Sequence, residues 1–184
     1  MARIILVTGG SRSGKSAYAQ KLAESLPGPR AYVATCPDID NEIHQRIHKH
    51  REARQHTDWH TIEETLNLAD VVNHGQGYNV LLVECVTLWI NNLMYEAEKA
   101  GREIAEEDVG RRSGEILAAC RAFEGTVIFV TNEVGMGIVP ENALCRRYRD
   151  LVGRCNQVLA ADADVVTLVT CGIPLDIKER RVDV

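Results

Sequence analysis

The chain has 184 residues, which is enough for one domain with a buried core. Hydrophobic residues make up 45% of it and charged residues 26%, as in an ordinary globular protein. A net charge of −5 argues against a dedicated nucleic-acid-binding protein, and no apolar run is long enough to predict a membrane span.

The cysteines give no sign of a zinc ribbon or a thioredoxin-type site, because no two of them form a C-x-x-C pair. The N-terminus also lacks the pattern of a signal peptide, since its apolar run is short and ends in glycines. We therefore predict a cytoplasmic protein whose thiols are reduced.

Strand-like and helix-like segments alternate along the chain. In chain order they are a strand over residues 4–8, a helix over 15–25, a strand over 31–35, a helix over 41–54, a strand over 80–84, helices over 87–100 and 106–123, a strand over 126–131, a helix over 143–160 and a strand over 164–170. This alternation predicts a single α/β domain with a mostly parallel central sheet flanked by helices. We expect the domain to cover residues 1–178, and residues 179–184 to form a frayed, charged tail.

A phosphate-binding loop is predicted directly after the first strand. The segment GGSRSGKS matches G-x-x-x-x-G-K-[ST] in full and has a strand before it and a helix after it. In such a loop, backbone N–H groups surround phosphate oxygens, Lys15 reaches the β- and γ-phosphates and the Ser16 hydroxyl binds Mg²⁺. The alternative is a Gly/Ser turn with no ligand. The residues of the loop are Gly9, Gly10, Ser11, Arg12, Ser13, Gly14, Lys15 and Ser16.

Glu84 ends an apolar strand, at the edge where ligands of open α/β sheets bind. A carboxylate there could complete a Mg²⁺ site with Ser16, directly or through a water. The alternative is an acid that stabilises the start of the next helix.

The segment RIHKHREAR leaves three alternatives open. Ile43 and Ile47 define an inward stripe of a helix, and the stripe passes through His50. His44 and His48 lie on another row with the spacing of two zinc ligands, although no third ligand is evident. The segment is therefore a solvated helix, a zinc site, or the carrier of a histidine nucleophile that attacks the α-phosphorus of a nucleoside triphosphate.

The segment TNEVGMGIVPEN reads as a loop that follows a strand, so it begins at the same sheet edge as Glu84. Asn132 and Glu133 could orient a nucleotide or a substrate group there, or the loop could be purely structural. Arg146, Arg147 and Arg149 in the next helix could meet phosphates or a neighbouring subunit.

Taken together, these motifs resemble the bifunctional adenosylcobinamide kinase/adenosylcobinamide-phosphate guanylyltransferase family, over residues 4 to about 178. The resemblance rests on ILVTGGSRSGKS, YVAT, RIHKHREAR followed by WHTIEE, LLVECVTLWINNL, and the long segment that begins TNEVGMGIVPEN. It implies a P-loop NTPase-like fold and two reactions. ATP or GTP phosphorylates the aminopropanol hydroxyl of adenosylcobinamide, and GMP from GTP is then transferred to that phosphate through a guanylylated histidine. The products of the second reaction are adenosylcobinamide-GDP and pyrophosphate.

The resemblance also assigns residues. The family motif R-I-x-x-H-[RK] places the guanylylated histidine at His50. Beyond the phosphate loop, the implied GTP contacts are Ala34, Thr35, Cys36, Arg51, Glu52, Ala53, Arg54, Glu63 and Glu84. A homotrimer is implied as well. The competing hypotheses are a monofunctional P-loop small-molecule kinase without a covalent intermediate and a nucleotide-switched binding module.

Overall fold

The computed structural model describes residues 1–37 and 59–179. Its strands are β1 (Arg3–Thr8), β2 (Arg30–Ala34), β3 (Trp59–Glu63), β4 (Val80–Glu84), β5 (Thr126–Val130), β6 (Val165–Thr170) and β7 (Ile173–Glu179). Its helices are α1 (Lys15–Ser25), α3 (Leu68–Asn73), α4 (Val86–Lys99), α5 (Glu106–Ala122) and α6 (Ala143–Asp162), with a 3₁₀ turn η1 (Val134–Met136).

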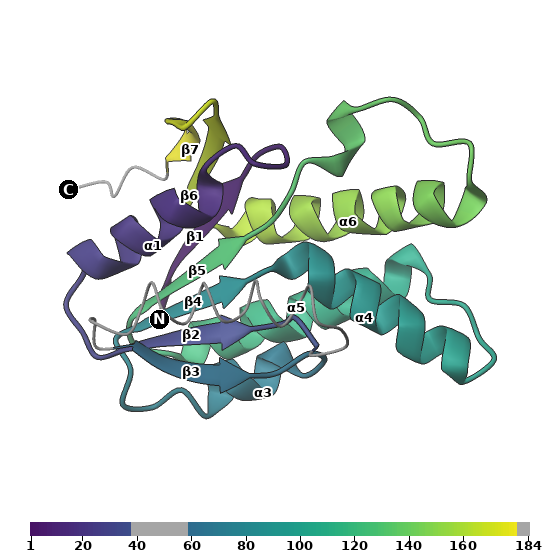
Figure 1. Cartoon of the computed structure of the whole chain (residues 1–184). Coiled ribbons are helices and arrows are strands. Elements are labelled where there is room, and N and C mark those ends of the chain that lie inside the picture. The colour runs from purple at the N-terminus through teal and green to yellow at the C-terminus, as the bar shows by residue number, and fades with distance from the viewer. Residues whose placement is uncertain (38–58, 180–184) are drawn as a thin grey trace.

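The described strands form one sheet in the order β3-β2-β4-β5-β1-β6-β7. All neighbours in it are parallel except β6 and β7, which pair antiparallel. The carboxyl ends of the parallel strands therefore meet at one edge, and the loop between β1 and α1 lies at that edge (Figure 1). The predicted α/β class with a mostly parallel sheet is confirmed.

Helices cover both faces of the sheet because the central strands are apolar on both sides. In β1, Ile4 and Leu6 pack with the apolar residues of α3, α4, α5 and α6, whereas Ile5 and Val7 pack on the other face against α1. This alternation follows from the two-residue repeat of a strand. All four side chains are almost completely buried.

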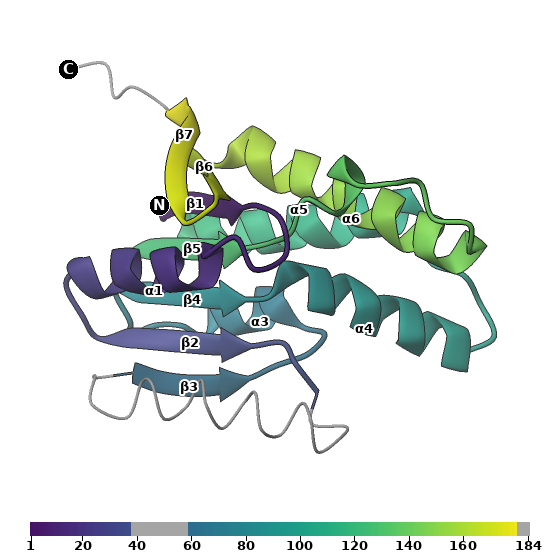
Figure 2. The same cartoon turned by 45° about the horizontal axis from the view of Figure 1, so that its top comes forward.

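Two helices extend past the carboxyl ends of the strands, as both views show (Figures 1 and 2). Helix α4 leaves the tip of β4, and α6 returns from beyond the sheet toward β6. Near the start of α4, Trp89 is buried and its indole N–H donates to the carbonyl of Leu66 at 2.9 Å. None of the helices in the described residues is long and apolar enough to cross a bilayer.

Each predicted strand or helix within the described residues begins and ends within two residues of its predicted bounds. The elements β3, α3 and β7 were not anticipated. β3 and β7 lie at the two edges of the sheet, where burial is incomplete. β3 lacks a clear apolar alternation, whereas β7 has an apolar residue at every second position from Ile173 to Ile177, a strand signal that the sequence analysis missed. Helix α3 has six residues, too few to show a helical period. The helix expected over residues 41–54 lies outside the described residues.

Candidate nucleotide-binding site

The glycines of the predicted phosphate loop are required by its close contacts. At Gly9 the φ angle is 154°, and an added Cβ would lie 2.2 Å from the carbonyl oxygen of Val169. At Gly14, which precedes α1, φ is 95°, and a Cβ would lie 3.2 Å from the Cα of Gly172. Only glycine fits both positions without displacing the neighbouring backbone.

Inside the loop, two polar groups are buried and make few hydrogen bonds or none. The ammonium of Lys15 donates to the carbonyl of Gly10 at 3.1 Å, and the residue is 8% exposed. The Ser13 hydroxyl is buried and has no hydrogen-bond partner within the part of the chain that the structure describes. A buried polar group without a hydrogen-bond partner lowers the stability of the folded protein. The Lys15 ammonium and the Ser13 hydroxyl are therefore well suited to donate hydrogen bonds to phosphate oxygens.

A hydroxyl and a carboxylate come together beside the loop. Ser16, in the first turn of α1, donates to Oε1 of Glu84 at 2.6 Å. Both are oxygen donors of the kind that Mg²⁺ prefers, and a triphosphate in the loop would supply further oxygens. The donor chemistry of these two residues therefore fits a magnesium ion. In residues 1–37 and 59–179, no group of three or more His, Cys, Asp and Glu side chains could hold a metal.

The sheet aligns three further predicted contacts in one row. Ala34 at the end of β2 pairs in register with Glu63 of β3 on one side and with Glu84 of β4 on the other. The N–H of the following residue, Thr35, donates to the carbonyl of Glu84 at 3.0 Å. Residues that are distant in sequence thus meet at one point of the carboxyl edge.

The junction between β4 and α4 is fixed by a second set of hydrogen bonds. The Thr35 hydroxyl donates to the carbonyl of Cys85 and accepts from its N–H, at 2.9 and 2.7 Å. The Cys85 thiol lies 2.7 Å from the hydroxyl of Thr87, which also accepts from Asn132 at 3.0 Å. Burial, together with the nearby charge of Glu84, raises the pKa of the Cys85 thiol. Both effects favour the protonated thiol over the nucleophilic thiolate.

A network of polar side chains lies beside the phosphate loop, and the sequence predicts only one of its members. The N–H of Glu133 donates to the carbonyl of Gly9 at 3.1 Å, and its Oε1 accepts from the Thr8 hydroxyl at 2.9 Å. The amide of Asn156 donates to the same oxygen at 3.2 Å and accepts from Thr131 at 2.7 Å. The sequence drew attention to Glu133 but missed Thr8 and Asn156. A polar Asn156 on the apolar face of α6 was the available signal.

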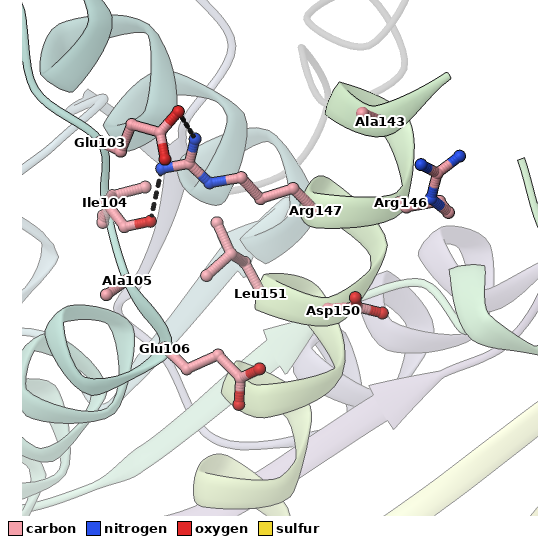
Figure 3. A pocket seen from close by; sticks show the side chains of 9 residues that line it. All are labelled: Glu103, Ile104, Ala105, Glu106, Ala143, Arg146, Arg147, Asp150 and Leu151. Atoms are coloured by element: carbon pink, nitrogen blue, oxygen red, sulfur yellow. Dashed lines mark hydrogen bonds and ion pairs between the residues drawn. The ribbon is translucent and has the colours of Figure 1, made fainter. Parts of the chain in front are cut away.

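A separate hollow of about 450 Å³ lies between the α4–α5 connection and the start of α6 (Figure 3). Arg147 spans it, pairing with Glu103 at 2.9 Å and donating to the carbonyl of Ile104 at 2.8 Å. Arg146 donates to the carbonyl of Pro140 at 2.9 Å. Both arginines thus fasten loops to α6, and no residue of the phosphate loop lines the hollow.

Five predicted site residues lie outside the described residues: His50, Arg51, Glu52, Ala53 and Arg54. Cys36, the remaining predicted contact before this gap in the description, follows Thr35 after the carboxyl end of β2.

Comparison with known proteins adds an independent observation. A family model described as "Cobinamide kinase / cobinamide phosphate guanyltransferase" matches residues 5–177. Proteins named "Bifunctional adenosylcobalamin biosynthesis protein CobU" from Escherichia coli and Salmonella typhimurium are each 40% identical to the chain, covering 95% of it and 99% of their own length. "Bifunctional adenosylcobalamin biosynthesis protein CobP" from Pseudomonas aeruginosa is 37% identical, covering 94% of the chain and 96% of that protein. Among solved structures, a KaiC-like protein from Pyrococcus horikoshii aligns with a TM-score of 0.46 at 14% identity, covering 90% of this chain and 70% of that one.

Proposed function

The chain belongs to the cobinamide kinase/cobinamide phosphate guanyltransferase family, and from this premise we propose that it catalyses two successive transfers to one corrinoid. In the first, the γ-phosphoryl group of ATP or GTP passes to the aminopropanol hydroxyl of adenosylcobinamide. In the second, GMP from GTP passes to the new phosphate, which gives adenosylcobinamide-GDP and pyrophosphate. The observation that carries the proposal is the phosphate loop with its Ser16–Glu84 contact of 2.6 Å.

For the first transfer, the phosphate loop supplies positioning and charge. Lys15 and the backbone N–H groups from Gly9 to Ser16 would hold the β- and γ-phosphates, and Ser16 and Glu84 would hold Mg²⁺. A bound Mg²⁺ would neutralise the charge that develops between these phosphates. Phosphoryl transfer depends mainly on such electrostatic stabilisation, so this set of residues can account for most of the rate.

For the second transfer, we assign the nucleophile to His50. Its imidazole attacks the α-phosphorus of GTP, a nitrogen–phosphorus bond forms, and pyrophosphate leaves. An oxygen of adenosylcobinamide phosphate then attacks the same phosphorus and releases the histidine. Arg51 and Arg54 would offset the negative charge of this step, and Ala34, Thr35, Cys36, Glu52, Ala53 and Glu63 would complete the contacts with GTP.

Mass spectrometry of the intact protein after incubation with GTP and Mg²⁺ tests this assignment. We expect an acid-labile adduct of the mass of GMP, mapped to His50 and discharged by adenosylcobinamide phosphate. His50→Ala should abolish the adduct, whereas His48→Ala, two residues away, should retain it.

An adduct that persists in His50→Ala would move the nucleophile to another residue. Complete absence of an adduct, with phosphorylation of adenosylcobinamide intact, would favour the monofunctional kinase. The two results separate an error in the residue from an error in the function.

We also propose a cytoplasmic homotrimer. Its support is the family membership together with apolar side chains on the outer strand β7, where Ile173, Leu175 and Ile177 are more than half exposed. Exposed apolar groups of this size often mark contacts between subunits. Light scattering coupled to size-exclusion chromatography should give a mass three times that of the chain, and a monomeric mass would contradict the proposal.

A further inference from the structure

Glu133 is a carboxylate that is held by one oxygen against the start of the phosphate loop. Its Oε1 accepts from the Thr8 hydroxyl at 2.9 Å and from the Asn156 amide at 3.2 Å, while its N–H donates to the carbonyl of Gly9 at 3.1 Å. Within the described residues, Oε2 has no hydrogen-bond partner. The carboxylate is thus fixed in place with one oxygen left for another group.

The charge of this residue needs an explanation of its own. A glutamine at this position could accept the same two hydrogen bonds with its amide oxygen. A carboxylate instead places a negative charge beside the loop that binds phosphates, and like charges at short range are unfavourable. The two hydrogen bonds that Glu133 accepts therefore do not explain why this residue is an acid, whereas a role as a proton acceptor does.

The other carboxylates at this edge of the described structure are engaged or distant. Glu84 accepts from Ser16 and is placed for the metal. Glu64 accepts the N–H groups of Leu66 and Asn67 at 2.7 and 2.9 Å, at the start of α3. Glu63 ends β3, which lies four strands from β1, or about 19 Å at about 4.8 Å per strand. Glu133, by contrast, follows β5, the immediate neighbour of β1.

From this geometry we propose that Glu133 is the general base of the phosphorylation step, an assignment that rests on the proposed function. As the aminopropanol oxygen forms its bond to the γ-phosphorus, the bond from that phosphorus to the β–γ bridging oxygen breaks. ADP or GDP leaves with that electron pair. The hydroxyl proton passes to Oε2 of Glu133 and is later released to water. No hydroxyl is deprotonated when GMP is transferred, so Glu133 has this role in the first reaction only.

Two substitutions separate the chemistry from the structure. Glu133→Gln keeps the shape and the hydrogen-bond acceptor but cannot take a proton, and we expect kcat for phosphorylation to fall about 100-fold while KM for ATP stays within about twofold. Glu133→Asp keeps a base on a shorter side chain and should retain more of kcat than Glu133→Gln. A purely structural role predicts the opposite order, because glutamine resembles glutamate more closely in shape. Glu141→Gln, an exposed position in the same loop, is the matched control.

Both activities are measured separately, with adenosylcobinamide phosphate supplied for the GMP transfer, and thermal unfolding is followed for each variant. A loss confined largely to phosphorylation, at unchanged Tm, is the expected result. The assignment is overturned if Glu133→Gln phosphorylates within about threefold of the wild type, or if both activities fall equally together with Tm. A wild-type protein that phosphorylates no adenosylcobinamide would overturn the proposed function itself, which is a distinguishable outcome.

Discussion

The hydroxyl of Ser16 lies 2.6 Å from a carboxylate oxygen of Glu84, although 68 positions separate the two residues in the chain. Ser16 is placed by the loop that follows β1, and Glu84 by the end of β4, two strands away in the sheet. The contact is thus a direct product of strand order. It joins the two oxygen donors on which the proposed magnesium site depends.

Glu84→Gln tests this metal site. The amide can still accept a hydrogen bond from Ser16 but lacks the charge that binds Mg²⁺. We therefore expect the Mg²⁺ concentration needed for half-maximal phosphorylation to rise about 10- to 100-fold, and kcat to fall. Titration of the rate with Mg²⁺ measures both. Ser16→Ala acts on the same ion. In free energy, the loss of Mg²⁺ binding in the double variant Ser16→Ala/Glu84→Gln should therefore be smaller than the sum of the losses in the two single variants. Glu98→Gln, on an exposed face of α4, is the control, and an unaltered Mg²⁺ titration in Glu84→Gln would exclude the site.

Asn92→Leu tests what stabilises the sheet edge that carries the proposed GTP contacts. The buried amide of Asn92 donates to the carbonyl of Thr35 at 2.8 Å and to that of Thr65 at 3.1 Å. Leucine is similar in size but leaves both carbonyls without this donor, which should lower the free energy of unfolding by about 2 kcal/mol. Affinity for GTP should weaken as well, because Thr35 is among the predicted contacts. Urea unfolding and calorimetric titration measure the two effects.

The neighbouring residue provides the comparison for that experiment. Asn91 is exposed on the same helix, so Asn91→Leu should change stability by less than about 0.5 kcal/mol. Equal losses in the two variants would show that the buried hydrogen bonds of Asn92 do not stabilise this edge.

Buried thiols should make stability fall at alkaline pH. Burial raises the pKa of the Cys120 thiol to about 12, from an unperturbed value of 9.0. Above pH 9 the unfolded chain therefore releases this proton more readily than the folded chain, and the thiol's contribution to stability is lost as pH rises toward 12. The slope is at most about 1.4 kcal/mol per pH unit for each such thiol. Burial raises the pKa of Cys155 to about 12 as well.

Urea unfolding of Cys120→Ala between pH 7 and 10.5, under reducing conditions, measures this contribution. The difference in stability from the wild type should shrink above pH 9, because the variant lacks one of the titrating groups. Cys145→Ala, at an exposed position, should follow the wild-type profile. Parallel curves for Cys120→Ala and the wild type would contradict the expected role of burial.

The sequence by itself determines features that are encoded by neighbouring residues. The phosphate loop is one contiguous motif, and its flanking strand and helix have strong local periodicity, so the motif alone predicts that Lys15 and Ser16 contact phosphate and metal. Glu84 is predicted as a site residue from its position at the end of an apolar strand. The histidine segment shows the limit, since helical spacing favours His50 but only the family resemblance gives it a chemical role.

Tertiary structure decided what depends on strand order and on the pairing of distant residues. The sequence contains Thr8, Glu133 and Asn156 but no pattern that joins them, because their contacts arise where β1, the chain after β5 and helix α6 meet. Likewise, the row of Glu63, Ala34 and Glu84 exists only because β2 lies between β3 and β4. Local periodicity reports which face of an element is buried, whereas the identity of the neighbour that buries it is a property of the whole packed chain.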